Sequence, residues 1–277
     1  MTIAAALREA AASLAEASIT PRFDAELLMA HVLGVSRSDL LLRHMDRAVP
    51  DGFAELIARR AAHEPLAYLL GEESFHGLTF KVDRGVLIPR PDSEVLVEAA
   101  LACRPDARTV LDCGTGSGAL LLAVLSQLGE ARGVGVDRSP EALAVASYNA
   151  QELGLGPRTR MVLADWDQAG WSDDLGGPFD LILANPPYVE TQAALEPSVR
   201  EYEPAGALYA GQDGLDAYRV LIPQIPHLFA PGGQAFFEIG ATQADAVRML
   251  ADDAGMAMTL HRDLADRPRV AQLWLEN

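Results

Sequence analysis

Three glycines alternate with two hydroxyl-bearing residues in the middle of the chain. The segment reads Gly114, Thr115, Gly116, Ser117 and Gly118, and an apolar stretch of helical length begins at Ala119. Glycine lets the backbone turn sharply and lets a ligand lie against main-chain N–H groups at the start of a helix, where a Cβ would collide with it. The spacing is GxGxG and not the GxGxxG of dinucleotide-binding loops, which argues against NAD. An ordinary tight turn between a strand and a helix is the alternative interpretation.

Acidic residues follow the next two apolar runs of the sequence. Asp137 comes 23 residues after Gly114, close to the interval of about 20 at which a carboxylate meets a ribose in α/β nucleotide-binding folds. Asp165 is followed by Trp166, a pair that offers an acceptor for an exocyclic amine and a flat face for an adenine ring. Alternatively, Asp137 caps a helix and Trp166 is a core or rim residue. Together with the glycine loop, these residues predict a site for an adenine nucleoside.

The fourth polar segment reads Asn185, Pro186, Pro187 and Tyr188. Two successive prolines remove two N–H groups and fix two φ angles, so the segment forms a stiff platform of hydrogen-bond acceptors. The Asn185 Oδ1 atom and the Pro186 carbonyl could each accept one hydrogen from a planar group that carries an NH₂, and Tyr188 could pack against its plane. A lone Asn-Pro pair more often marks a turn, but NPPY at the end of a fourth strand is far more specific.

These polar segments follow short apolar runs that alternate with helical stretches. The runs span residues 109–111, 133–136, 160–163, 179–183, 234–239, 257–260 and 270–275. Strands of this length between helices of about 10 to 15 residues predict βαβ units and a parallel sheet covered on both faces. Because ligands bind at the carboxyl ends of the strands in such sheets, we expect the candidate residues to converge there.

The first part of the chain has a different pattern. Apolar residues recur at helical spacing over 3–17, 23–33, 40–44 and 53–62, which predicts a small all-helical domain. The period then changes to two around a His76-Gly77 turn, which predicts a β-hairpin, and a helix is expected over 92–103. The predicted organisation is a helical domain over 1–71, a hairpin linker over 72–90 and an α/β domain over 91–277.

Charge and composition exclude several classes of protein. The chain carries 22 basic and 39 acidic residues, a net charge of −17, of which residues 1–71 contribute only −2. A field of this sign repels a nucleic-acid backbone, so we expect no direct nucleic-acid partner. Apolar runs are shorter than the ~20 residues that cross a bilayer, and the first residues lack the uncharged block of an export signal. We therefore expect a cytoplasmic protein with no membrane partner.

Cysteine and histidine residues show no pattern of a metal or redox site. Cys103 and Cys113 have no CxxC or histidine neighbour, and the six histidines are scattered without ligand spacing. We expect two free thiols in a reducing compartment and no metal.

Four motifs in chain order resemble those of class I S-adenosylmethionine-dependent methyltransferases: DCGTGSG at 112–118, VDRS at 136–139, ADW at 164–166 and ILANPPY at 182–188. Further segments, GEESFHGLTF at 71–80, LIPRPDSE at 87–94 and VREYEP at 199–204, are similar to those of the N5-glutamine methyltransferases of peptide chain release factors. This resemblance covers nearly the whole chain. It implies a Rossmann-like, seven-stranded, mostly parallel sheet, joined by the β-hairpin to the small helical domain.

The resemblance also implies roles for individual residues. It assigns the loop from Gly114 to Gly118 to the methionine part of S-adenosylmethionine, Asp137 to the ribose, and Trp166, with Asp165 beside it, to the adenine. It assigns the NPPY segment to the substrate glutamine, with catalytic roles for Asn185, Pro186 and Tyr188, a binding role for Pro187, and contact of Asn185 with the cofactor as well.

The implied activity is methyl transfer to the glutamine of the Gly-Gly-Gln motif in release factors. We expect a monomeric enzyme, and we expect the small, nearly neutral helical domain to dock the protein substrate. The alternatives are a glutamine methyltransferase acting on a ribosomal protein, a DNA adenine-N6 methyltransferase, and a binding module without catalysis. The acidic charge argues against DNA. The chain's own Gly232-Gly233-Gln234 is interpreted as a turn before a strand, and not as a substrate sequence.

Overall fold

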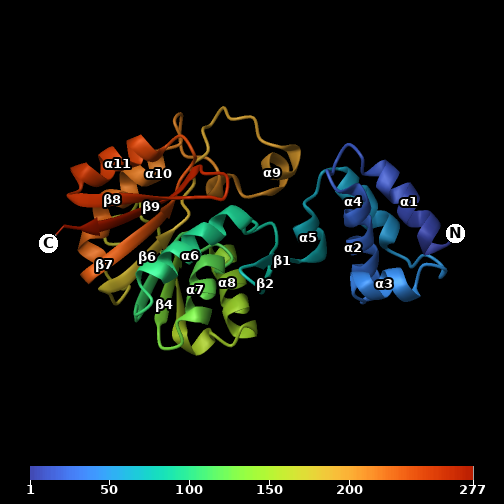
Figure 1. Cartoon of the computed structure of the whole chain (residues 1–277), viewed down its shortest axis with the longest axis horizontal. Coiled ribbons are helices and arrows are strands. Elements are labelled where there is room, and N and C mark those ends of the chain that lie inside the picture. Colours follow the sequence, from blue (N-terminus) through green and yellow to red (C-terminus); the bar gives the residue numbers. More distant parts are fainter. Residues whose placement is uncertain (277) are drawn as a thin grey trace. The chain divides into compact units, whose positions relative to one another are not determined.

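The computed structural model describes residues 1–276 and divides them into two compact units (Figure 1). Unit 1 contains Met1–Glu72 together with Leu195–Tyr202, and unit 2 contains Glu73–Ala194 and the chain from Glu203 onward. Unit 1 is therefore built from two segments that lie far apart in the sequence.

Unit 1 is helical. Its helices are α1 (Ile3–Ser13), α2 (Pro21–Leu33), α3 (Arg37–Arg43), α4 (Phe53–Ala61), α5 (Leu66–Leu70) and α9 (Pro197–Tyr202). Ser36 caps α3 by accepting from the Asp39 N–H, and Gly34 ends α2 in the left-handed conformation. The hydroxyl of Tyr202 in α9 donates to the Ala62 carbonyl at 2.8 Å, which attaches the distant segment to the end of α4.

Buried carboxylates of α2 form ion pairs within unit 1. Asp24 accepts from Arg60 at 2.8 Å, and Glu26 accepts from Arg22 at 2.6 Å and from Arg37 at 2.7 Å. The loss of one partner would leave a buried charge uncompensated, so these pairs fix how α2 meets α3 and α4. They account for the acidic residues that interrupt the apolar pattern of α2.

Unit 2 contains a sheet of seven strands in the part of the chain that the structure describes. The strands are β3 (Thr109–Cys113), β4 (Arg132–Asp137), β5 (Thr159–Leu163), β6 (Phe179–Ala184), β7 (Phe229–Glu238), β8 (Met256–Arg262) and β9 (Pro268–Leu275). Their order is β5-β4-β3-β6-β7-β9-β8, with parallel pairing from β5 to β7 and antiparallel pairing of β9 with both neighbours. The predicted mostly parallel, Rossmann-like sheet is confirmed.

Helices cover both faces of the sheet, because successive strand residues point to opposite sides. In β6, Leu181 and Leu183 join one apolar cluster, while Ile182 and Ala184 join the other. The first cluster packs against α6 (Glu94–Cys103), α7 (Ala119–Gln127) and α8 (Pro140–Glu152). The second packs against α10 (Asp216–Leu221), the 3₁₀ helix η4 (Ile222–Leu228) and α11 (Ala244–Asp253), as the layers in Figure 1 show.

A two-stranded hairpin precedes this sheet. It consists of β1 (Glu72–Phe75) and β2 (Leu78–Lys81), and it is followed by the short 3₁₀ helix η1 (Pro91–Ser93). The buried Asn149 of α8 holds β2 in place, because it accepts from the Lys81 N–H at 2.8 Å and donates to the Lys81 carbonyl at 3.1 Å. The same amide donates to the Ser117 carbonyl at 2.8 Å, so the hairpin and the glycine loop share one anchor.

Several predicted boundaries are wrong. The first helix ends at Ser13, before the predicted residue 17, and α5 was not predicted at all. The hairpin ends at Lys81, since Val82 onward forms no strand before β3. Gly232 and Gly233 lie inside β7, where the pairing with β6 shifts register, and do not form a turn before the strand. Within residues 1–276, the helices are too short or too polar to cross a membrane.

Candidate active site

The carboxyl ends of β3 and β6 lie side by side where the strand order changes direction. Ligands bind at this position in open α/β sheets. A cavity of about 360 Å³ opens there in unit 2. The predicted residues that line it are Gly114, Thr115, Gly116, Ser117, Asp137, Asp165, Trp166, Asn185 and Pro187. Gly118, Pro186 and Tyr188 lie next to these residues in the sequence but outside the lining.

Main-chain hydrogen bonds attach the glycine loop to the neighbouring strand. The N–H groups of Gly114 and Thr115 both donate to the Val136 carbonyl at 2.8 Å. The φ angle is 76° at Gly114 and 54° at Gly116, a region that other residues rarely adopt. A Cβ at Gly114 would also lie 3.1 Å from Cη2 of Trp166. The turn and the nearby ring therefore both require glycine at position 114.

Asp137 holds the loop from the end of β4. Its Oδ2 accepts from the Gly116 N–H and its Oδ1 accepts from the Ser139 N–H, each at 2.9 Å. The cap of α8 is Ser139, whose hydroxyl accepts from the Ala142 N–H at 3.1 Å. Each carboxylate oxygen of Asp137 keeps a further lone pair, so this residue on the cavity wall can still accept hydroxyl hydrogens from a ligand.

Trp166 supplies an aromatic surface on the same wall. Its ring lies against Gly114, and Gln224 of η4 fixes its backbone by donating to the Trp166 carbonyl at 3.2 Å. Asp165 precedes it and accepts from the Asp167 N–H at 3.1 Å. The loop, the carboxylate of Asp165 and the indole ring thus form one continuous part of the lining.

A fully buried carboxyl group belongs to the penultimate residue of β3, two positions before Gly114. Asp112 Oδ2 accepts from the Thr115 hydroxyl at 2.7 Å, whereas Oδ1 has no hydrogen-bond partner within residues 1–276. Burial raises the pKa of Asp112 to about 7. The hydrogen bond from the Thr115 hydroxyl lowers this pKa, and the negative charge of Asp137 raises it further. When Asp112 is ionised, it places a negative charge behind the loop, which favours a cationic ligand.

The NPPY segment is a rigid platform after β6. The side-chain amide of Gln243 donates to the Tyr188 carbonyl at 3.1 Å and to the Gly214 carbonyl at 3.0 Å. A Cβ at Gly214 would lie 2.3 Å from the Tyr188 oxygen, so only glycine permits this close approach. Asn185 and Pro187 line the cavity, while Tyr188 packs against the apolar cluster that faces α10.

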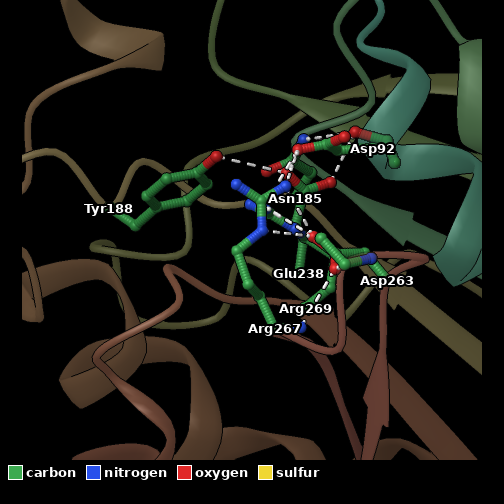
Figure 2. A network of polar contacts seen from close by, with 9 residues as sticks. Asp92, Asn185, Tyr188, Glu238, Asp263, Arg267 and Arg269 are labelled. Carbon is green, nitrogen blue, oxygen red and sulfur yellow. Dashed lines mark hydrogen bonds and ion pairs between the residues drawn. The ribbon is translucent and has the colours of Figure 1, made fainter.

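A buried carboxylate at the end of β7 joins Asn185 to Tyr188 (Figure 2). Asn185 Nδ2 donates to the Ser93 hydroxyl at 3.3 Å, and this hydroxyl donates to Glu238 Oε2 at 2.5 Å. The Tyr188 hydroxyl donates to Glu238 Oε1 at 3.2 Å. Burial raises the pKa of Glu238, and the Ser93 hydroxyl opposes this rise. Burial together with the Glu238 charge raises the pKa of Tyr188, which keeps its phenol protonated.

Sequence reasoning missed Ser93 and Glu238. Glu238 ends an apolar strand, as Asp137 does, and the register that pairs Ala184 with Phe237 places it beside Asn185. An acidic residue at the end of the fifth apolar run was the available signal. Ser93 has no comparable signal, because its role depends on contacts with Asn185 and Glu238, which lie far away in the sequence.

The turn between β8 and β9 supports this network (Figure 2). Arg269 contacts Asp92 at 2.9 Å and Asp263 at 3.4 Å, and Arg267 contacts Asp263 at 2.8 Å. The N–H groups of Ala265 and Arg267 donate to Asp263, and they hold the pKa of its carboxyl below the usual range. The turn thereby fixes Asp92, the residue next to Ser93.

A second buried carboxylate joins the segment before η1 to the chain that follows α9. Glu203 accepts from the Ile88 N–H at 3.2 Å and forms an ion pair with Arg90, which lines the cavity. The segment that carries Ser93 is therefore held by two buried carboxylates. Glu203 contacts it at Ile88 and Arg90, and Glu238 contacts it at Ser93.

Two family models match the chain. The PrmC N-terminal domain model matches residues 5–71, and a methyltransferase domain model matches residues 105–267. Among solved structures, the ribosomal protein L11 methylase of Lactobacillus delbrueckii subsp. bulgaricus has a TM-score of 0.52 and 21% identity, covering 72% of this chain and 86% of its own. This likeness shows the shared fold.

Curated relatives match over nearly the full length. The release factor glutamine methyltransferase of Cereibacter sphaeroides is 43% identical over 98% of this chain and 97% of its own length. The protein of the same name from Geobacter sulfurreducens is 44% identical over 82% of this chain and 79% of its own length. The chain therefore belongs to the release factor glutamine methyltransferase family, as its motifs predicted.

Proposed function

We propose that the protein transfers a methyl group from S-adenosylmethionine to the side-chain amide nitrogen of the glutamine in the Gly-Gly-Gln motif of peptide chain release factors. The observation that carries this proposal is the position of Asn185 on the wall of the cavity that also holds the glycine loop, Asp137 and Trp166. The family supplies the substrate class, since the relatives are named release factor glutamine methyltransferases.

The lining residues fit S-adenosylmethionine. Gly114 and Gly116 leave bare backbone for its methionine part, Asp137 has free lone pairs for a ribose, and Trp166 offers a ring for the adenine. The carboxyl of Asp112, behind the loop, favours the positive charges of the cofactor when it is ionised. When bound, the cofactor supplies a methyl group attached to a sulfonium.

The glutamine amide nitrogen is a poor nucleophile, because its lone pair is delocalised into the carbonyl. In the proposed mechanism, Asn185 Oδ1 and the Pro186 carbonyl accept its two hydrogens and favour the pyramidal geometry of the transition state. Tyr188 and Pro187 keep the platform rigid. The NPPY segment contains no acidic residue or histidine, so we assign no general base, and the product loses its proton to water.

The experiment that tests this function offers labelled S-adenosylmethionine and four acceptors to the purified full-length protein. These are a release factor, the same release factor with the Gly-Gly-Gln glutamine replaced by alanine, a ribosomal protein, and duplex DNA. Label on the first acceptor alone supports the proposal. Label on the ribosomal protein or the DNA would favour one of the alternative substrates, and no label on any acceptor would favour a binding module.

Docking of the protein substrate is assigned to unit 1, the helical domain. Its charge is nearly balanced, and it exposes the large apolar side chains of Ile19, Phe23 and Leu42. Scattered apolar side chains are ordinary, so the assignment needs a direct test. Leu42→Asp should raise the KM for release factor roughly tenfold and leave kcat unchanged, since loss of a buried contact weakens binding.

The matched control for this test is Met249→Asp in unit 2. Met249 is 68% exposed and Leu42 is 79% exposed, so both substitutions place a charge on an open surface. Equal KM values for the two variants would contradict the docking role of Leu42. The cytoplasmic location and the monomeric state stay predictions from the sequence.

A further inference from the structure

The hydrogen bonds from Asn185 to Glu238 have a defined direction. Ser93 has one hydroxyl hydrogen, and it is used in the 2.5 Å bond to Glu238 Oε2. Toward Asn185, Ser93 can therefore present only lone pairs, and the atom it faces at 3.3 Å must be the donor Nδ2. The acceptor Oδ1 is then left for the cavity, which Asn185 lines.

An ionised carboxylate imposes this direction because it can only accept hydrogen bonds. Both oxygens of Glu238 receive a hydroxyl, from Ser93 on one side and from Tyr188 on the other. Glu238 is 1% exposed, so water does not compete for its lone pairs. Burial raises the pKa of Glu238, and the Ser93 hydroxyl and the Arg269 charge, held nearby on Asp92, oppose this rise. A neutral group in the same place could donate as well as accept, and it would not fix which atoms donate in the hydrogen bonds between Glu238, Ser93 and Asn185.

We propose that Ser93 and Glu238 are positioning residues that determine which end of the Asn185 amide faces the cavity, and that they thereby make the site select a glutamine side chain over a glutamate. This inference rests on the proposed function. Glutamine carries an NH₂ that can donate to Oδ1, whereas a glutamate carboxylate has only acceptors and would meet the Asn185 oxygen without a hydrogen between them. Rejection by an unpaired buried polar group is a strong source of specificity.

Residue 93 allows a test with two variants of the same shape. Ser93→Thr keeps the hydroxyl, and Ser93→Val replaces that hydroxyl with a methyl group. Ser93→Thr should stay close to the wild-type kcat. Ser93→Val should lower kcat by roughly tenfold or more, because the Asn185 amide loses the partner that orients it. Binding of S-adenosylmethionine should be equal in both variants, which shows that each is folded.

The preference for glutamine over glutamate in the release factor is the decisive readout, because partial unfolding of the protein would not change this preference specifically. The competitor is a release factor with glutamate in place of the Gly-Gly-Gln glutamine, and the measured quantity is its inhibition constant relative to the KM of the glutamine form. In the wild type and in Ser93→Thr, this competitor should inhibit weakly. In Ser93→Val the Asn185 amide can turn its Nδ2 toward the cavity, so the ratio should fall several-fold. Glu238→Gln, which adds a donor to the network, should lower it as well.

The outcomes separate this inference from the proposed function. A wild type that does not methylate release factor would contradict the function. In that case the side-chain amide hydrogens of Asn185, followed by NMR hydrogen exchange without substrate, still test the network. They should be protected in the wild type and in Ser93→Thr but not in Ser93→Val. Equal protection, equal kcat or equal selectivity in Ser93→Thr and Ser93→Val would overturn the inference. If Ser93→Val does not fold, an unchanged selectivity ratio in Glu238→Gln would overturn it.

Discussion

The two halves of the cavity are built in different ways. The half that fits the cofactor consists of backbone and of residues that directly follow β3, β4 and β5, and its main contacts join neighbours such as Gly116 and Asp137. The half that fits the glutamine depends on side chains from four separate segments, in which Ser93 reaches Glu238 across 145 residues of sequence.

This difference separates two ways of making a site specific. In the cofactor half, the fold itself produces the site, because a parallel sheet with a glycine turn presents N–H groups and strand-end carboxylates to any bound nucleoside. In the glutamine half, the platform alone does not decide whether a donor or an acceptor faces the substrate. A buried polar network does so, and such networks are costly when one member loses its partner.

The largest effect is expected for Asn185→Ala, which removes the acceptor of the glutamine half. The rate of methyl transfer should fall by roughly 10² to 10³, by analogy with the loss of one oxyanion-hole donor. The affinity for S-adenosylmethionine should change far less if the two halves are as separate as the contacts indicate. Single-turnover kinetics and calorimetry measure the two quantities. A folded variant with nearly full activity would contradict the role of Asn185.

The next effect concerns Asp112 in the cofactor half. Its pKa of about 7 lies above the ordinary 3.8, so the folded protein binds more protons than the unfolded chain between these values. The contribution of Asp112 to the free energy of unfolding must therefore fall as the pH rises through this window. Asp112→Asn lacks this titration. As the pH rises through this window, the free energy of unfolding of the variant should therefore increase relative to that of the wild type, by up to roughly 1.4 kcal/mol per pH unit.

Urea unfolding of both proteins at about pH 5, 6, 7 and 8 measures this difference. Between the last two pH values the difference should flatten, because above its pKa of about 7 the folded-state carboxyl becomes mostly ionised, as it already is in the unfolded chain. A difference in stability that does not depend on pH would show that the buried carboxyl does not titrate in this range.

A smaller effect is expected for Gly114→Ala. The new methyl group would require a φ of 76° and would lie 3.1 Å from the Trp166 ring. The affinity for S-adenosylmethionine should fall about tenfold, because the loop is strained and the ring must move. Gly129→Ala is the control, since a Cβ there meets nothing within 4 Å and its φ is not in the left-handed region. Equal affinity of both variants in calorimetry would remove Gly114 from the binding site.

The smallest effect is expected for Cys113, which lies beneath the glycine loop in the apolar cluster. Burial raises the pKa of this thiol well above its usual value, so the native protein should be alkylated at the partly exposed Cys103 and not at Cys113. Cys113→Ala should leave kcat unchanged. Mass spectrometry after brief alkylation shows which thiol reacts, and rapid labelling of Cys113 would mean that the loop opens to solvent.

The same comparison explains what could be predicted from the sequence. Every residue predicted for the cofactor half stands at a strand end or a glycine turn, and these features have local signals in spacing and residue type. Asn185 could be predicted as a cavity residue because two prolines follow it. Ser93 is an ordinary serine in the sequence, and only the packing of η1 against the ends of β6 and β7 gives it a role.

Some local structure could not be predicted for similar reasons. Helix α5 is only five residues long, so it has too few turns for a helical period to appear. Gly232 and Gly233 read as a turn, yet β7 continues through them because a bulge against β6 accommodates their conformation. At Gly232 and Gly233, strand pairing decided the outcome, and not local preference.

The course of the chain through unit 1 limits how the protein can be modified. The chain passes from unit 1 to unit 2 after Glu72, returns at Leu195 and leaves again after Tyr202. The returning segment follows the NPPY platform and ends directly before Glu203, the residue bonded to Ile88 and Arg90. A chimaera that exchanges only the first 72 residues would therefore place α9 against a foreign partner. Domain exchange between relatives has to transplant both segments, because α9 of unit 1 lies in the same stretch of chain as the NPPY platform of unit 2.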